Sequence, residues 1–175
     1  GTMRIDLFTD TLAMNIHARV TFIGLGAMGS AMARHLMNAG YLVTVHARRP
    51  EVMQPFVDDG AMGASSPAEA AKNADFIFTN VTSTQDVEEV LLGDKGVIHG
   101  AQAGAVVCDM STISAVATRD IAAKLAAKGI HMLDCPVSGG AKGAQAATLT
   151  IVVGGKPEIL DKARPLLERL GTNIC

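Results

Sequence analysis

Short apolar runs alternate along the chain with segments in which apolar residues recur every three or four positions. The runs predict strands, because β-branched and apolar residues bounded by turn residues are typical of buried strands. They span residues 19–23, 41–45, 75–79, 105–108, 130–133, 148–153 and 172–175. The periodic segments predict helices that end at Gly40, cover 50–58, begin at Pro67, cover 84–92, end at Ala127 and cover 157–170. This alternation predicts an α/β fold with a doubly wound, mostly parallel sheet.

The segment 18–50 joins the first two strands through a glycine-rich turn and a helix. Gly24, Gly26 and Gly29 follow the first strand in G-x-G-x-x-G spacing. In this setting the first glycine permits a tight turn, the second lets the backbone approach a diphosphate, and the third lets the helix pack closely on the sheet. The free N–H groups at the helix start favour phosphate. The alternative is a turn that binds nothing. We expect a dinucleotide site formed by Gly24, Leu25, Gly26, Ala27, Met28 and Gly29.

The end of the second strand bears on which dinucleotide is bound. A free ribose 2′-hydroxyl is usually met by Asp or Glu about twenty residues beyond the glycines. Here the strand ends in His46-Ala47-Arg48-Arg49, with no carboxylate before Glu51. Guanidinium groups suit a 2′-phosphate, so the pattern favours NADP, bound through Arg48. NAD stays an alternative, with Glu51 on the ribose, and the arginines could also be solvated surface charges.

Composition narrows the class of protein. The chain has 175 residues, nearly half of them apolar and few aromatic, with a formal net charge of −2. This length suits one domain with its own core. We divide it into an N-terminal extension, 1–18, and an NADP-binding Rossmann domain, 19–175. The charge argues against a nucleic-acid partner. No apolar run is long enough to cross a membrane, and the start lacks the pattern of a secretory signal.

The cysteines and the search for a proton donor give negative predictions. Three cysteines without metal-ligand spacing indicate a reduced, cytoplasmic protein with no metal site. Cys135 has no histidine near it in sequence, so we expect a packed thiol rather than a nucleophile. Hydride transfer also needs a group that exchanges the hydroxyl proton. Lys142 is a candidate, but a loop lysine is more often solvated, so we assign no catalytic residue.

Two further loops follow predicted strands and carry polar groups. In the loop 109–112, Ser111 and Thr112 could bond a nicotinamide ribose or a substrate carboxylate; alternatively, one of them caps the next helix. In the loop 134–140, Ser138, Gly139 and Gly140 offer a hydroxyl and approachable N–H groups that suit a carboxylate. Because ligands bind at the carboxyl ends of parallel strands, we expect these loops to converge with the glycine turn.

Four ordered motifs resemble one family: FIGLGAMGSAMARHLMNAG, DMSTI, DCPVSGG and TLTIVVGG. From about Val20 onward, the chain is similar to the β-hydroxyacid dehydrogenases. This family includes 3-hydroxyisobutyrate dehydrogenase and tartronate semialdehyde reductase, and the motifs look most like those of the second. The resemblance implies hydride transfer between NADP(H) and a small 3-hydroxy acid or semialdehyde. It also implies a set of contacts. The 24–29 loop would hold the diphosphate, Arg48 would face the 2′-phosphate, Val81, Thr82 and Thr112 would lie along the nicotinamide, and Ser138, Gly139 and Gly140 would meet the substrate carboxylate.

The chain also departs from the family pattern. Where this chain has Val81-Thr82, the family often has Leu-Pro. At the positions of Asp86 and Ala47, the family commonly has Asn. In the family, a catalytic Lys and a nearby Asn stand on a helix after this domain, followed by a helical dimerisation domain. The sequence ends at Cys175, so the resemblance covers an N-terminal half without that C-terminal helical domain. We therefore expect weak NADP(H) binding without efficient reduction by this chain alone, and a homodimer through an uncovered apolar face.

Two other functions are compatible with the motifs. One is a non-catalytic dinucleotide-binding module, which would bind NADPH without turnover even when joined to a helical domain. The other is a relative of the imine reductases, which share the glycine loop and an arginine of the NADP type. The DCPVSGG loop favours a carboxylate-bearing substrate over an imine.

Overall fold

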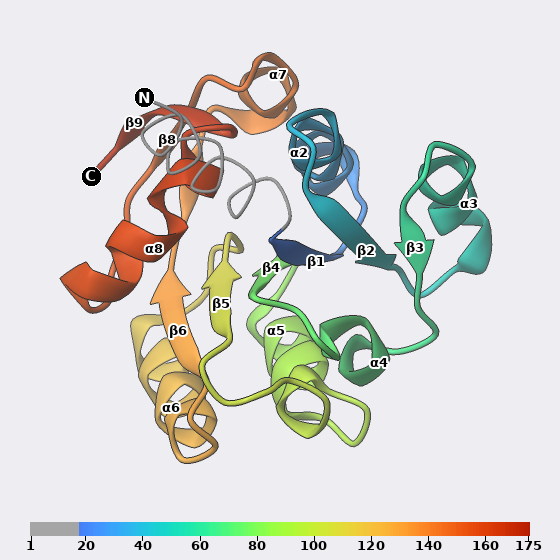
Figure 1. The fold of residues 1–175 in the computed structure, drawn as a ribbon. Helices are drawn as coiled ribbons and strands as arrows, with labels where there is room; N and C mark the ends of the chain where they lie inside the picture. The colour runs from blue at the N-terminus through green and yellow to red at the C-terminus, as the bar shows by residue number, and fades with distance from the viewer. Residues whose placement is uncertain (1–17) are drawn as a thin grey trace, which may run out of the picture.

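The computed structural model describes residues 18–175, and the expected N-terminal extension lies outside these residues except for Ala18. A six-stranded sheet forms the centre of the molecule, with the strand order β3-β2-β1-β4-β5-β6 (Figure 1). All pairings in this sheet are parallel. Its strands are β1 (Arg19–Ile23), β2 (Leu42–His46), β3 (Met62–Gly63), β4 (Phe76–Thr79), β5 (Val106–Asp109) and β6 (His131–Asp134).

Helices cover both faces of this sheet, as a doubly wound fold requires. One buried cluster joins the sheet to α2 (Ala27–Asn38), α3 (Pro50–Asp58) and α8 (Pro157–Leu167). A second cluster joins the other face to α4 (Pro67–Ala71), α5 (Thr84–Leu92) and α6 (Ala115–Ala126). The predicted α/β class, with its mostly parallel Rossmann sheet, is therefore confirmed.

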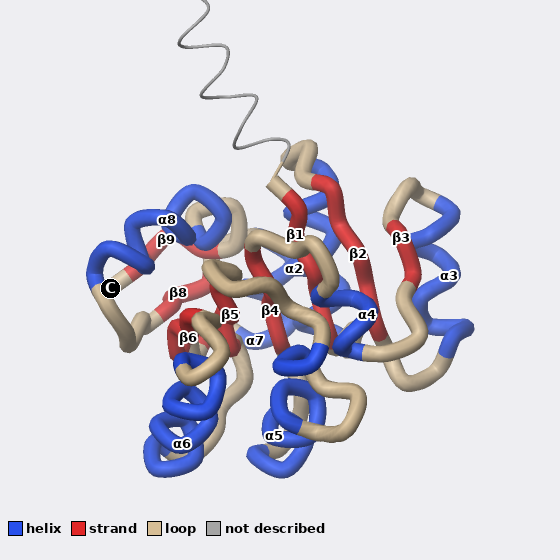
Figure 2. Tube along the Cα trace, turned by 60° about the horizontal axis from the view of Figure 1, so that its bottom comes forward, coloured by secondary structure: helices blue, strands red, loops and turns tan. Residues whose placement is uncertain are grey.

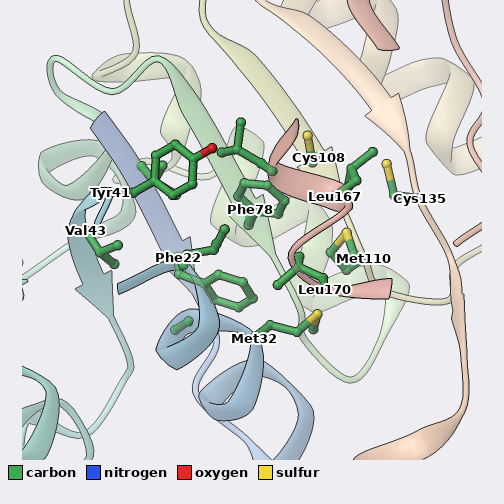
Figure 3. Close-up of a cluster of buried hydrophobic side chains, with 14 of the residues drawn as sticks. Phe22, Met32, Tyr41, Val43, Phe78, Cys108, Met110, Cys135, Leu167 and Leu170 are labelled. Atoms are coloured by element: carbon green, nitrogen blue, oxygen red, sulfur yellow. The ribbon is translucent and has the colours of Figure 1, made fainter. Parts of the chain in front are cut away.

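The first cluster is built from large side chains on neighbouring strands (Figure 3). Phe22 of β1 and Phe78 of β4 are register partners, and their rings stack with centroids 5.8 Å apart. Met32 of α2 and Leu167 of α8 are also fully buried in this cluster. Apolar positions that recur on these helices therefore fix them to one face of the sheet, and the helix termini come to lie at its edges.

The C-terminal part differs from the expected single sheet. The chain forms β7 (Val137–Ser138), α7 (Gly140–Ala146), β8 (Leu149–Ile151) and β9 (Gly171–Ile174), and β7, β8 and β9 make a separate three-stranded sheet. The β7 and β8 strands are antiparallel, and the connection through α7, residues 139–148, is shorter than the dozen or more residues that a parallel crossover needs. A bridge between Asp134 and Gly154 places this small sheet beside β6 (Figure 2).

Candidate functional site

The loops after β1, β4 and β5 converge at one edge of the sheet. The sheet ladder continues into each loop, since the N–H groups of Asn80 and Met110 donate to Ile23 and Thr79 at 2.9 and 2.8 Å. After β1 the chain adds β2 and β3 on one side of it, and then adds β4, β5 and β6 on the other side. The topological switch point therefore lies between β1 and β4. Open α/β sheets bind ligands in the crevice at this point. The predicted convergence of the glycine turn with the loop 109–112 is confirmed, and the loop after β4 lies between them.

Two of the three motif glycines are required by the fold itself. Gly24 has φ +98°, and a Cβ there would lie 2.1 Å from the Asn80 carbonyl oxygen. A Cβ on Gly29 would lie 2.0 Å from the Gly24 carbonyl oxygen. Both contacts involve backbone, which cannot move aside cheaply. The positive φ and the closeness of the loop after β4 explain Gly24, and the packing of α2 against the turn explains Gly29, without any ligand.

Gly26 is different from the other two. A Cβ at this position would meet no atom of the described chain within 4 Å, its sequence neighbours aside, and the backbone does not adopt a positive φ. Neither steric contact nor strain requires glycine here. The missing side chain instead leaves open space beside an exposed backbone at the start of α2, which fits the approach of a diphosphate.

The N-terminus of α2 is also uncapped. Ser66, Ser83 and Ser114 cap α4, α5 and α6, each accepting an N–H from the first turn at 3.1 Å, whereas α3, α7 and α8, like α2, have no side-chain cap among the described residues. At the Gly26 N-cap of α2, no side chain of residues 18–175 makes such a bond, and the first turn holds no acidic residue. Its first N–H groups and the positive end of the helix dipole therefore suit an anion. Within the same loop Leu25 is buried, Ala27 is exposed and Met28 is half-buried.

Arg48 follows β2 and forms an ion pair that the sequence did not predict. Its Nη2 lies 2.6 Å from Oδ1 of Asp86, in the first turn of α5. Thr82, predicted along the nicotinamide, donates its hydroxyl to the other oxygen of Asp86 at 2.7 Å. Hydrogen bonds from Thr82, Arg48 and Ser83 lower the pKa of Asp86. The structure thus places Arg48 and Thr82 on one carboxylate.

The ends of β4 and β5 are joined by a buried network around Asp109. Its Oδ1 accepts the Thr79 hydroxyl at 2.9 Å and the Ser111 N–H at 3.1 Å. The Ser111 hydroxyl in turn accepts the Val81 N–H at 2.9 Å. Ser111 is 2% exposed, so it braces the loop after β4 from beneath. The sequence analysis missed Asp109; its only local signal is an acidic residue at the end of a buried strand.

Asp109 has one oxygen without a partner. Its Oδ2 is buried and has no hydrogen bond among residues 18–175. Burial is the main cause that raises the pKa of this carboxyl group, and the nearby charge of Asp134 adds to it. The group therefore favours its neutral form more than an exposed aspartate does.

Other polar residues of the loops have separate roles. The alternative that Ser111 or Thr112 caps the following helix is wrong, because Ser114 caps α6. Thr112 is exposed. Ser138, Gly139 and Gly140 are exposed where β7 meets α7, and a Cβ on Gly140 would meet no described atom within 4 Å. This open backbone is sterically free to approach a small anion.

The thiols confirm the expectation of packing. Cys135 is fully buried, and a hydrogen bond with the Cys108 thiol together with burial raises its pKa. A thiol held in its neutral form is a poor nucleophile. Residues 18–175 contain no group of three or more side chains able to hold a metal ion, and none of their helices has the length and apolarity to cross a membrane.

Comparisons with known proteins identify the family. A family model described as the NAD binding domain of 6-phosphogluconate dehydrogenase matches residues 19–175. An NAD-dependent L-serine dehydrogenase of Pseudomonas aeruginosa is 42% identical over 156 residues, which cover 89% of this chain and 52% of the relative. A 3-sulfolactaldehyde reductase of Escherichia coli is 40% identical over 157 residues, covering 90% and 53%.

Solved structures agree with this assignment. Mycobacterium tuberculosis 3-hydroxyisobutyrate dehydrogenase with L-serine superposes with a TM-score of 0.84 at 34% identity, covering 91% of this chain and 54% of that one. Psf3 in complex with NADP+ and 2-OPP gives 0.83 at 33% identity, covering 89% and 55%. An imine reductase from a Pseudomonas species gives 0.82 at 27% identity, covering 90% and 54%.

The chain spans about half the length of the curated relatives it matches. The expected family and the expected coverage of its nucleotide-binding half are both confirmed. The chain belongs to the β-hydroxyacid dehydrogenase family of NAD(P)-dependent dehydrogenases and reductases, and it carries the NAD(P)-binding domain of that family.

Proposed function

We propose that residues 19–175 bind NADP(H) and form the cofactor half of an oxidoreductase acting on a small 3-hydroxy acid or semialdehyde. The observation that carries the proposal is the open space at Gly26 beside an uncapped helix N-terminus, located at the switch point of the sheet. The cofactor, when bound, supplies or accepts the hydride. The chain's own residues bind it and fix its orientation.

The backbone of Gly24, Leu25, Gly26, Ala27, Met28 and Gly29 would hold the diphosphate. Arg48 would meet the ribose 2′-phosphate, and Val81, Thr82 and Thr112 would lie along the nicotinamide. Support comes from Val81, whose N–H is tied to the buried Ser111 hydroxyl, so that the loop beside the crevice is held in place. NAD stays an alternative cofactor, because a relative named as NAD-dependent and a structure with NADP+ both match this chain.

Ser138, Gly139 and Gly140 would bind the carboxylate of the substrate. Their exposure and the open space at Gly140 support this role. Ser111, also predicted to contact substrate, is buried and bonded to Val81, so we assign it to bracing the loop instead. A small carboxylate-bearing substrate agrees with the L-serine in the matched dehydrogenase structure. No described residue is assigned as the proton donor.

Gly26→Ala tests the proposal directly. The new methyl group would occupy the open space outside the loop, so we expect NADPH affinity to fall by about tenfold or more, as for the loss of a phosphate-binding interaction. An alanine N-cap costs only about 0.5 kcal/mol of folding stability relative to glycine. Calorimetric titration with NADPH and NADH measures the first effect, and urea unfolding measures the second.

Two results of that experiment would reject the proposal. One is wild-type protein that binds neither dinucleotide at millimolar concentration. The other is a folded Gly26→Ala variant that binds as tightly as the wild type. A non-catalytic module, the competing function, would bind NADPH but give no turnover even when fused to the helical half of a matched dehydrogenase.

A further inference from the structure

We propose that Asp86 tunes the choice between NADP and NAD, because a ribose 2′-phosphate must take Arg48 away from this carboxylate. The inference rests on the proposed dinucleotide site at Gly24–Gly29. Its subject is the ion pair between Arg48 Nη2 and Asp86 Oδ1, which joins two loops at 2.6 Å.

The position of this pair places it over the cofactor crevice. Arg48 follows β2, and Asp86 lies in the first turn of α5, after β4. The β2 and β4 strands flank β1 on its two sides in the sheet. A bond from the end of β2 to the segment after β4 therefore passes across the carboxyl end of β1, where the glycine loop begins.

Asp86 is the fixed partner in the pair. Its Oδ2 accepts the Thr82 hydroxyl at 2.7 Å, and its N–H donates to the Ser83 hydroxyl at 3.1 Å. Its side chain is 23% exposed, against 75% for Arg48. Asp86 is ionised near neutral pH, as an aspartate ordinarily is, and hydrogen bonds with Thr82, Arg48 and Ser83 lower its pKa further. The guanidinium can thus leave, whereas the negative charge stays.

A fixed negative charge beside Arg48 affects the two cofactors differently. A 2′-phosphate needs the guanidinium and is repelled by the remaining carboxylate. An unphosphorylated ribose carries no charge there and has no such conflict. Asp86 therefore weakens NADP binding selectively, while Arg48 strengthens it. The exposed Lys124–Asp120 pair on α6, with Nζ and Oδ2 3.1 Å apart, involves no residue of the proposed site and provides a control.

The test compares Asp86→Asn with Asp120→Asn in the full chain. Asn keeps the size of Asp86 and an acceptor for Thr82 but removes the charge. We expect it to raise affinity for NADPH, and for the fragment 2′,5′-ADP, by about fivefold, the upper range for one exposed ion pair. Affinity for NADH and 5′-AMP should stay unchanged. Asp120→Asn should alter the NADPH-to-NADH ratio by less than about twofold.

A second variant shows whether the effect passes through Arg48. Arg48→Met should lower affinity for NADPH and leave NADH binding intact, and Asp86→Asn should add little selectivity in that background. All affinities come from calorimetric titration, with melting curves to confirm folding. Folded Asp86→Asn that leaves the ratio unchanged, or weakens NADPH binding, overturns this inference while the proposed function stands. Wild type that binds neither dinucleotide overturns both.

Discussion

The loops after β1 and β5 lie at the same edge of one sheet, but the polar groups of the first are exposed and those of the second are buried and hydrogen-bonded. After β1, the backbone at Gly26 is exposed, and the helix it starts has no side-chain cap among the described residues. After β5, Asp109 and Ser111 are buried and bonded to the neighbouring strand and loop. The first loop leaves hydrogen-bonding capacity for a ligand, whereas the second uses it to hold the crevice in shape.

The largest expected loss of stability comes from adding a methyl group at Gly29, in the first turn of α2, where the fold needs glycine. In Gly29→Ala, the Cβ would lie 2.0 Å from the Gly24 carbonyl oxygen. We expect a loss of about 3 kcal/mol in unfolding free energy from overpacking, even after the helix-propensity gain of alanine. Urea unfolding measures it, with Gly26→Ala as the matched control. Equal stability of the two variants would show that the close approach at Gly29 does not constrain the fold.

Removing the hydroxyl from the closed β5 loop should have a smaller effect on stability. Ser111→Ala leaves the Val81 N–H without its acceptor. We expect a loss of about 2 kcal/mol, the usual range for an orphaned buried group. The control is Ser114→Ala, which removes an exposed helix cap and should cost about 1 kcal/mol. If Ser114→Ala destabilises the protein more, the buried bond is not the stronger brace.

Asp109→Asn should change the free energy of unfolding least at acidic pH. The change should grow as the pH rises. Burial raises the folded-state pKa of Asp109 above its unfolded value. The associated stability is therefore present below the unfolded pKa and is lost as the pH rises through the folded pKa. Asn keeps the acceptor used by Thr79 and Ser111 but cannot ionise.

Urea unfolding of both proteins across a pH series measures this difference. We expect the variant to gain stability relative to the wild type with increasing pH. The other aspartates are common to both proteins, so their contributions cancel to first order. A difference that does not change with pH would mean that Asp109 ionises in the folded protein as readily as in the unfolded chain.

Local pattern predicted the regular elements well. The bounds of α5, at Thr84–Leu92, and of β1, at Arg19–Ile23, agree with the expected ranges because each has a clear apolar period or run. By contrast, β3 has two residues, too few for any period. The small sheet of β7, β8 and β9 depends on the geometry of a short connection, which the spacing of apolar residues does not determine.

The side-chain partners of the candidate site were harder to predict. The sequence identified Arg48 and the glycines, but not the Asp86 that holds Arg48 or the Asp109 network. Arg48 and Asp86 are 38 positions apart, and Thr79 and Asp109 are 30 apart. Their meeting follows from which strands are neighbours and in what register, information that emerges only from the assembled sheet.

The different reasons for the three glycines bear on how such chains should be recognised. A descendant that lost nucleotide binding would still need Gly24 and Gly29 to assemble its architecture, whereas nothing in the packing would hold it to Gly26. Searches that score the whole G-x-G-x-x-G string equally would thus accept degenerate, cofactor-free scaffolds. Glycine at the middle position of the motif is therefore the one whose presence indicates nucleotide binding.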